Sequence, residues 1–295
     1  MTSIERGRIM AHRWSIHGIV LAVAVVLLCV NAASAQLSGR VGDVIESMPQ
    51  GSVDWTKGIV TATGLGAPPE NAVNRAQARA MAERAASIVA TRNLLEVVKG
   101  IRVDSATLVE NMITTSDVIK TQVSGTLQGA QIMKKQVNPD GSVEVMVGVR
   151  LTGDLLNTLI PKQTGGGEPI QVPPAAALPP SQAAFTGLIV DARGTGLRPA
   201  MAPKIRNEEG REVYGSAFVN RQYAVEQGMV GYLKDVNAAQ QNARVTDRPL
   251  LVKAVKTDGP NKTDLVISNS DAQVLHGMKE HLTFLEKARV MVILD

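Results

Sequence analysis

The sequence predicts two domains that mix helices and strands. The first is an α+β domain over residues 54–161, with helices on one face of an antiparallel sheet, and the second is a mixed α/β domain over residues 185–295. A Pro- and Gly-rich segment separates them. Before it, the patterns run strand, helix, helix and hairpin; after it, short apolar runs alternate with helical patterns. With 295 residues, 44% of them hydrophobic and 20% charged, the chain has a globular composition.

The first 35 residues predict a secretory signal peptide. Three arginines precede an apolar run over residues 18–30, and the small residues Ala33-Ser34-Ala35 follow it, so we expect cleavage between Ala35 and Gln36. The apolar run is shorter than the ~20 residues that a membrane-spanning helix needs. The mature chain is therefore expected to have no transmembrane span.

Cys29 raises an alternative, because a lipoprotein signal also places a Cys after an apolar run. Val26, Leu27 and Leu28 are bulky where a lipobox needs small residues, which favours cleavage at Ala35 over attachment of a lipid at Cys29. Cleavage at Ala35 would remove the single Cys of the chain, so that neither a disulfide nor thiol chemistry would remain.

The mature chain has a nearly balanced charge. Removal of the leader takes away three arginines and Glu5 and leaves 28 basic and 26 acidic residues. Without a Lys/Arg-rich cluster, and with 3% aromatic residues, the sequence predicts no nucleic-acid partner.

In the first domain, residues 55–63 predict a strand that ends in a turn at residues 64–66. A long helix is expected from Pro68 and Pro69 to Gly100. Its predicted core stripe consists of Ala78, Met81, Ala85, Ile88, Leu95 and Val98. Four residues are expected on other faces as solvated charges: Arg75, Arg79, Glu83 and Arg84. Arg92 interrupts the stripe.

Asp104 or Ser105 is expected to cap a second helix that continues to Ile119. Residues 127–137 and 142–151 alternate apolar and polar side chains around the turn sequence Asn138-Pro139-Asp140-Gly141, which predicts a hairpin. Alternate valines of residues 143–149 should face the core. An uncovered edge at residues 127–137 would allow self-association or pairing with another chain.

Three segments of residues 53–152 together resemble a known family: GIVTATGLG, the Ala/Arg-rich NRAQARAMAERAA, and VSGTLQGAQIMKKQVNPDGSVEVMVGVRL. This pattern is similar to the bacterial envelope family named for the LPP-twenty lipoprotein, and to the related N-terminal domain of flagellar assembly protein T. The resemblance implies an exported, non-enzymatic envelope protein, which in some members is part of the ring around the flagellar basal body. It supplies no catalytic residue.

Residues 162–183 contain three consecutive glycines and five prolines, which predicts a flexible linker. In the second domain we expect strands at residues 186–192, 250–255, 264–268 and 288–294, and a hairpin over residues 204–216. Helices are expected over residues 220–243 and 271–285, the latter capped by Asn269 or Ser270.

The segment from Arg193 to Arg198 follows a predicted strand, as a phosphate-binding loop would. Pro199 and Pro203 prevent the helix that a dinucleotide site needs directly after its glycines. We therefore expect this segment to be a glycine-rich loop that connects two elements and not a nucleotide site. If the domain binds a small anion, Arg193, Gly194, Gly196 and Arg198 are the expected contacts, since guanidinium groups suit carboxylate and phosphate oxygens.

The remaining candidates favour structural roles. His276 and His281 are five residues apart on a predicted helix, too far around it to share one metal ion, and are expected to be partly exposed. Ser268, Asp271 and His276 lack the context of a catalytic triad. Six aromatic residues of the second domain are expected in its core or at its edges. No catalytic residue, metal site or cofactor is predicted.

The sequence thus predicts a protein that is periplasmic or associated with the outer membrane and that binds other envelope proteins. The most concrete form, which only the family resemblance implies, is a component of a flagellar or other periplasmic ring, with basal-body proteins as partners. The alternative is a module of the second domain that binds a small ligand or a polysaccharide, and an envelope hydrolase ranks third. A large apolar surface patch would favour the first of these, whereas a pocket of ~300–1,000 Å³ near Arg193 or Arg198 would favour the second.

Overall fold

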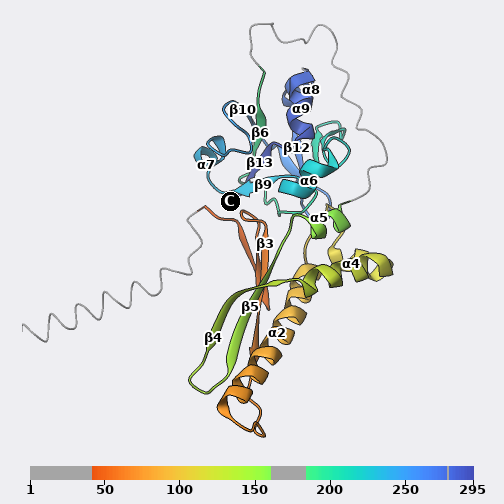
Figure 1. Ribbon diagram of the computed structural model, residues 1–295. Coiled ribbons are helices and arrows are strands. Elements are labelled where there is room, and N and C mark those ends of the chain that lie inside the picture. The colour runs from red at the N-terminus through yellow and green to blue at the C-terminus, as the bar shows by residue number, and fades with distance from the viewer. Residues whose placement is uncertain (1–41, 161–183, 278) are drawn as a thin grey trace, which may run out of the picture. The chain divides into compact units, whose positions relative to one another are not determined.

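A computed structural model describes residues 42–160, 184–277 and 279–295, which fold as α-helices and β-strands in three sheets (Figure 1). Within these residues there are eight helices and thirteen strands, which confirms the predicted mixture of helix and strand. The predicted signal peptide and the predicted linker at residues 162–183 lie outside the described residues.

The first sheet is antiparallel throughout and has the order β1-β2-β3-β5-β4. Its strands are β1 (Ile45–Met48), β2 (Gly51–Asp54), β3 (Ile59–Gly66), β4 (Gln131–Val137) and β5 (Val143–Arg150). The predicted hairpin is confirmed, with Gly141 at a φ of +86° in its turn. Val143, Val145 and Val147 are buried, as their alternation predicted.

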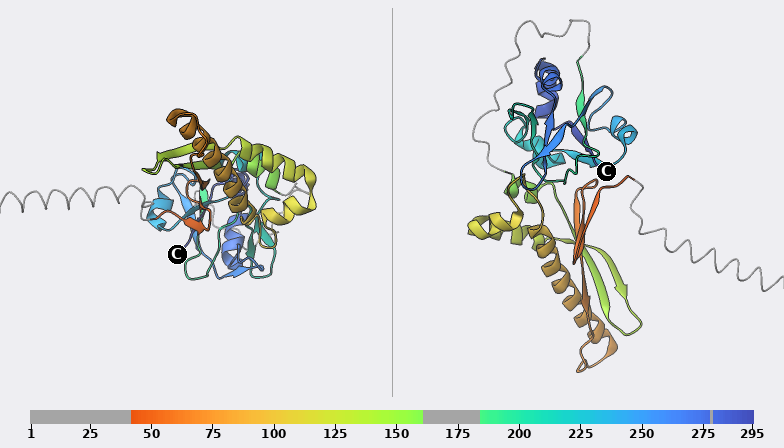
Figure 2. Two further views of the ribbon diagram at one scale, coloured as in Figure 1. Left: turned by 90° about the horizontal axis from the view of Figure 1, so that it is seen from below. Right: turned by 180° about the vertical axis from the view of Figure 1, so that it is seen from behind.

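One long helix, α2 (Arg75–Lys99), covers this sheet and lies along β3 and β5 (Figures 1 and 2). Three shorter helices complete this region: α3 (Val109–Thr115), α4 (Asp117–Gln128) and α5 (Asp154–Leu159). Helices α3 and α4 contact α2, and α5 contacts α4. The first described region therefore has the expected arrangement of helices on one face of an antiparallel sheet.

Several predicted boundaries are wrong. Residues 55–58 form a turn rather than the start of a strand, because Gly58 takes a φ of +64° and the Asp54 carboxylate accepts a hydrogen bond from Lys57 N at 2.9 Å. The expected turn at residues 64–66 is instead the end of β3. The long helix begins at Arg75, where Asn74 accepts a hydrogen bond from Gln77 N at 2.8 Å.

The second predicted helix is two helices. Ser116 has an extended backbone, which ends α3, and its hydroxyl caps α4 by accepting a hydrogen bond from Ile119 N. Helix α4 continues to Gln128, so residues 127–130 do not belong to the hairpin strand. The two strands β1 and β2, within residues 45–54, were not expected from the sequence.

Residues 184–295 form two four-stranded sheets. The parallel sheet has the order β10-β6-β13-β9, with β6 (Gly187–Asp191), β9 (Gly231–Leu233), β10 (Pro249–Lys253) and β13 (Val290–Ile293). The mixed sheet has the order β11-β12-β7-β8, with β7 (Ile205–Asn207), β8 (Glu212–Tyr214), β11 (Lys256–Asp258) and β12 (Asp264–Ile267). The predicted mixed α/β class is confirmed.

Both long helices predicted in this region are interrupted. Between residues 220 and 243 lie α6 (Arg221–Gln227), strand β9 and α7 (Val236–Gln240), because Gly228 leaves the helix with a φ of +85°. Between residues 268 and 287 lie α8 (Asn269–His276) and α9 (Lys279–Glu286). Ser268, rather than Asn269 or Ser270, caps α8 by accepting a hydrogen bond from Asp271 N.

Residues 42–295 form one compact unit, and the regions on the two sides of the predicted linker share a hydrophobic core. Backbone hydrogen bonds join the regions, from Met201 N to Arg102 O at 3.0 Å and from Ala202 N to Val103 O at 2.7 Å. Arg102, which is 3% exposed, donates to Pro199 O and to the Glu46 carboxylate. Burial alone would raise the pKa of Glu46, but the hydrogen bond and charge of Arg102 hold it below its usual value.

Candidate interaction surface

Helix α2 lies unusually close to the sheet through a stripe of small residues. Ala82, Ala86 and Ala90 are buried against β3, where Gly64 and Gly66 face the helix. A Cβ atom at Gly64 would lie 2.2 Å from Ala90 N, and one at Gly66 would lie 2.0 Å from Ala82 O. These two glycines are therefore required by the close approach of α2 and not by a turn.

This packing decides which residues of α2 face outward. The predicted core stripe is wrong in part, because Met81 is 47% exposed and Ile88 is 49% exposed. The buried positions are Ala82, Ala86, Ala90, Leu94, Val97 and Val98. The helix therefore has a second apolar stripe, made of Met81, Ile88 and Leu95 at a spacing of seven residues, on the side away from the sheet.

Helix α4 forms one wall of a groove along this second stripe. The groove has a volume of about 530 Å³. It is lined by Arg84, Ser87, Ile88, Thr91, Arg92 and Leu95 of α2 and by Ser124, Leu127 and Gln128 of α4. We call it the α2–α4 groove. Its floor is apolar, and an arginine lies toward each end of its α2 side.

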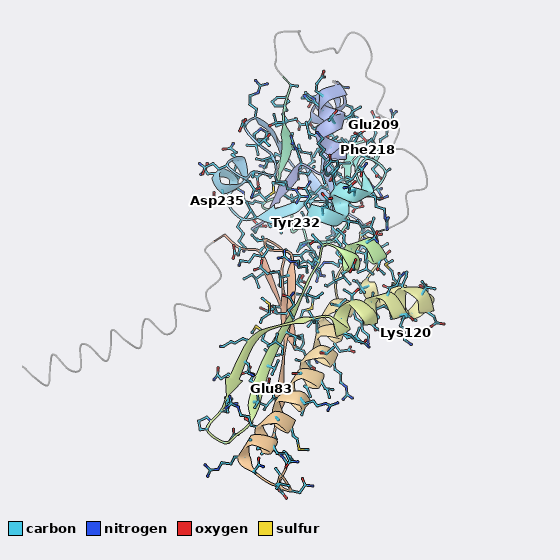
Figure 3. The ribbon with its side chains drawn as sticks, viewed as in Figure 1. Glu83, Lys120, Glu209, Phe218, Tyr232 and Asp235 are labelled. Atoms are coloured by element: carbon cyan, nitrogen blue, oxygen red, sulfur yellow. The ribbon has the colours of Figure 1, made fainter. Side chains whose placement is uncertain are left out.

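The two arginines of the groove carry uncompensated charge. The acidic residues of α2 are paired elsewhere: Glu83, labelled in Figure 3, with Lys135 of β4 at 2.8 Å, and Glu96 with Lys99 at 2.8 Å. Within the part of the chain that the structure describes, neither Arg84 nor Arg92 has a carboxylate within 4.0 Å. The groove therefore combines an apolar floor with two exposed positive charges.

Strand β4 forms the expected uncovered edge of the first sheet. All seven of its residues are exposed, including Ile132 and Met133 at 54% and 52%. The register shifts between Ile132 and Lys134, so that Met133 is displaced from the ladder, and Lys134 and Lys135 follow. A bulge and lysines are features that protect sheet edges from pairing with other strands.

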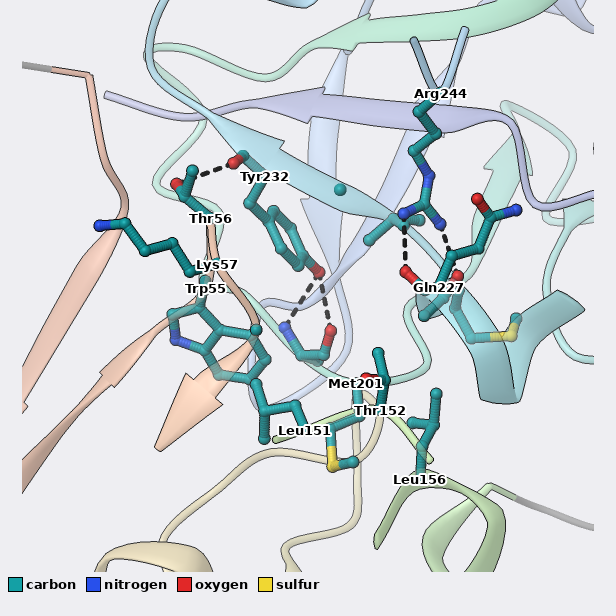
Figure 4. A pocket seen from close by; sticks show the side chains of 16 residues that line it. Trp55, Thr56, Lys57, Leu151, Thr152, Leu156, Met201, Gln227, Tyr232 and Arg244 are labelled. Atoms are coloured by element: carbon teal, nitrogen blue, oxygen red, sulfur yellow. Dashed lines mark hydrogen bonds between the residues drawn. The ribbon is translucent and has the colours of Figure 1, made fainter. Parts of the chain in front are cut away.

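A smaller pocket lies where the two described regions meet (Figure 4). Its volume is about 110 Å³, and Trp55, Leu151 and Tyr232 are among its lining residues. Tyr232 is 3% exposed, and its hydroxyl donates to Ala200 O at 2.9 Å and accepts from Ala200 N at 3.0 Å. Burial raises the pKa of this hydroxyl. The Trp55 ring meets the Tyr232 ring edge-on, at 5.8 Å between centroids.

Arg244 closes one side of the same pocket. Its guanidinium donates to Ala288 O at 2.8 Å, and to Gln227 O at 2.8 Å and Gly228 O, as Figure 4 shows for the last two. Burial lowers the pKa of Arg244. Three backbone carbonyl groups satisfy this cation, and the volume of the pocket is below the ~300 Å³ of ordinary ligand sites.

The predicted anion-contact loop is held by contacts within the protein. Arg193 pairs with Asp191 at 2.7 Å, which lowers the pKa of Asp191. Gly194 N donates to both carboxylate oxygens of Asp295, at 2.9 and 3.1 Å. Arg198 lies 3.6 Å from Glu46. Gly194 and Gly196 have φ angles of +78° and +69°, as tight turns require. Other residues line the α2–α4 groove and the pocket beside Tyr232, and ligand contact at this loop stays a prediction.

The predicted partial exposure of the histidines is wrong. His276 is 7% exposed and lies on α8 with Nε2 2.9 Å from Val213 O. His281 is 0% exposed; its Nδ1 lies 2.8 Å from Val274 O, and its Nε2 accepts a hydrogen bond from Phe185 N at 3.2 Å. This pair of contacts selects a neutral ring with the proton on Nδ1. Burial lowers the pKa of His276.

The other predicted candidates have structural roles. Ser268 caps α8 and donates to the Asp271 carboxylate at 2.7 Å. Tyr214, Tyr232 and Phe284 are buried, as expected for core aromatics, whereas Tyr223 is 37% exposed.

A further cavity of about 570 Å³ lies between α4, α5 and α6 and includes Met112, Val118 and Arg221 in its lining.

The α2–α4 groove is the feature that sequence reasoning missed. Met81, Ile88 and Leu95 were expected in the core, and Arg84 and Arg92 were treated as a solvated charge and an interruption. The available signal was the interruption itself: apolar residues seven apart with arginines between them indicate a second face of the helix.

Among the described residues, no helix combines the length and the apolar character needed to cross a membrane. A comparison with curated proteins finds no match to the chain. Two family models match parts of it. Residues 66–150 match the model of the LPP20 lipoprotein, which confirms the resemblance predicted from the sequence. The chain is thus similar to the LPP20 lipoprotein over residues 66–150 and to the second domain of Treponema pallidum Tp0624 over residues 187–295.

Proposed function

We propose that the protein is an exported, non-enzymatic component of the cell envelope that works by binding another envelope component. The observation that carries this proposal is the α2–α4 groove, where Ile88 is half exposed on an apolar floor. Exposed apolar grooves with a polar rim are typical of protein-binding sites.

The match of residues 66–150 to the LPP20 lipoprotein supports an envelope location. The leader pattern at residues 1–35 supports export, and we place the mature protein in the periplasm or at the outer membrane. Cleavage after Ala35 would give an unlipidated chain that begins at Gln36. Mass spectrometry of the N-terminal peptide tests this prediction. A peptide that begins at a lipid-modified Cys29 would show that the protein is anchored in a membrane instead.

The positions of the histidines support a non-enzymatic role. Both are buried and contact backbone carbonyl groups, His276 that of Val213 and His281 that of Val274. A general base must reach the proton that it abstracts in an accessible site. We therefore assign the histidines to packing.

The finer form of the proposal is a component of a flagellar or other periplasmic ring, with ring proteins as the partner. A ring subunit must bind neighbours through surfaces that remain exposed in the single chain. The α2–α4 groove is such a surface in this chain.

Affinity capture of the tagged protein from crosslinked envelopes of its own organism tests the proposed function. We expect a specific envelope protein to be recovered in stable proportion, and recovery of basal-body proteins would support the ring form. A tagged, unrelated periplasmic protein at the same expression level is the control. Recovery of nothing above that control, with the protein free in the periplasm, would contradict the proposal.

A further inference from the structure

We propose that the α2–α4 groove binds an amphipathic helix of the partner, which carries an apolar stripe flanked by two carboxylates. The inference rests on the proposed function and specifies the chemistry of the partner. It follows from the spacing of the apolar residues, the position of the arginines and the charges that a second copy would bring.

The spacing favours a helix as the bound element. Met81, Ile88 and Leu95 recur every seven residues along the outer face of α2, which is the repeat with which one helix packs along another. Leu95 packs against the core, whereas Met81 and Ile88 are about half exposed. A second helix laid along α2 would cover these two side chains.

The charges select the partner. Arg84 and Arg92 are eight residues apart, which corresponds to about 12 Å along the helix axis. Neither has a carboxylate within 4.0 Å among the residues that the structure describes, and the two glutamates of α2, Glu83 and Glu96, pair with lysines. Carboxylates about two helical turns apart on the incoming helix would pair with both guanidinium groups.

The same charges argue against a second copy of this chain in the groove. Two parallel copies of α2 in register would place Arg84 against Arg84 and Arg92 against Arg92. An antiparallel pair centred on Ile88 would place Arg84 against Arg92. Either arrangement brings like charges together in the interface, which is unfavourable.

Two double charge reversals on α2 test the inference. The groove variant is Arg84→Glu/Arg92→Glu. The matched control is Arg75→Glu/Arg79→Glu, whose two arginines are exposed on the same helix and do not line the groove. Because all four side chains are exposed, we expect both variants to fold, which circular dichroism and the thermal midpoint verify.

Capture from crosslinked envelopes is then repeated with the wild type and both variants. We expect the groove variant to lose about tenfold or more of the wild-type partner and the control variant to retain it. If the wild type captures no envelope partner, the proposed function fails together with this inference. If the partner is captured equally well by the groove variant, this inference alone is overturned.

A photocrosslinker at the centre of the groove identifies what occupies it. Ile88 is replaced by p-benzoyl-phenylalanine, and the crosslinked peptide is sequenced by mass spectrometry. We expect a segment with apolar residues at helical spacing and Asp or Glu seven or eight residues apart. A crosslink to a second copy of this chain, to a phospholipid or to a basic segment would overturn the inference, as would the absence of any crosslink.

Discussion

At the scale of single residues, Gly64 and Gly66 allow α2 to lie directly on β3. The sequence pattern predicts a turn at these glycines, but neither has a positive φ, and β3 continues through both. Their missing side chains leave room for the backbone of Ala82, Ala86 and Ala90. A sequence pattern cannot separate these two uses of glycine, because the helix that approaches is distant in the sequence.

A Gly64→Ala substitution should therefore destabilise the protein. The new Cβ would meet the α2 backbone, and the helix would have to move, at a cost of about 1–3 kcal/mol. Gly125→Ala is the matched control, since Gly125 lies inside α4 and a Cβ atom there would meet nothing within 4 Å. It should stabilise the protein by about 0.5–1 kcal/mol. Urea unfolding measures both changes, and equal stability of the two variants would refute the packing argument.

His276 should make the fold sensitive to mild acid. Burial lowers its pKa from 6.5, so the unfolded chain binds a proton that the folded chain resists. The contribution of neutral His276 to the free energy of unfolding is therefore fully present above pH 6.5 and decreases as the pH falls below that value. His276→Gln keeps a donor toward Val213 O and should reduce this loss. Thermal midpoints of both proteins from about pH 7.5 to 5 provide the measurement; parallel curves would assign the effect to other groups.

At the scale of elements, β4 is a sheet edge that is protected against pairing. Lys134 and Lys135 and the displaced Met133 occupy the middle of the strand. Lys135 also pairs with Glu83 of α2, whereas Lys134 has no ion-pair partner within the described residues. An uncovered edge would allow pairing with another chain, but these features of the strand oppose it.

Lys134→Val should make the protein more prone to self-association. The substitution removes a protective charge beside two exposed apolar residues, Ile132 and Met133. Sedimentation velocity at several protein concentrations should show larger species for the variant than for the wild type. Lys120→Val, at an exposed position of α4, controls for the loss of one charge. The prediction fails if the two variants associate equally.

Local rules located most elements but not their limits. The hairpin of β4 and β5 and the strands β6, β10, β12 and β13 follow from apolar alternation and turn residues. The helix expected over residues 220–243 does not form as one piece, since Tyr232 is placed in the parallel sheet beside β13 and is buried there. Long-range pairing overrides local helix propensity at such a position.

At the scale of the whole molecule, described residues from both sides of the predicted linker share one large hydrophobic cluster. The predicted linker separates the regions in the sequence, but backbone hydrogen bonds and the buried Arg102 join them. A shared core implies cooperative unfolding. We therefore expect a single transition in differential scanning calorimetry of the mature protein, and two well-separated transitions would contradict this.

Arg102→Ala should weaken the contact between the regions on the two sides of the predicted linker. It would remove the donor to Pro199 O and one of the partners of Glu46, which is 25% exposed and keeps its contacts with Trp55 and Arg198, so we expect a loss of about 1–3 kcal/mol. Arg75→Ala, on an exposed turn of α2, should change stability by less than about 0.5 kcal/mol. Denaturant titration compares the two, and an equal, small effect would show that Arg102 is not essential to the contact.

The sequence by itself determined the mixed helix and strand composition of both regions, the hairpin and the similarity of residues 66–150 to the LPP20 lipoprotein. These depend on periodicity, turn residues and family-specific segments, which are local. Only the tertiary structure decided which face of α2 is buried, where the histidines lie and that α4 encloses a groove with Ile88, Arg84 and Arg92. The reason is physical: a helix with two apolar stripes can bury either, and the contact with Gly64 and Gly66 selects one.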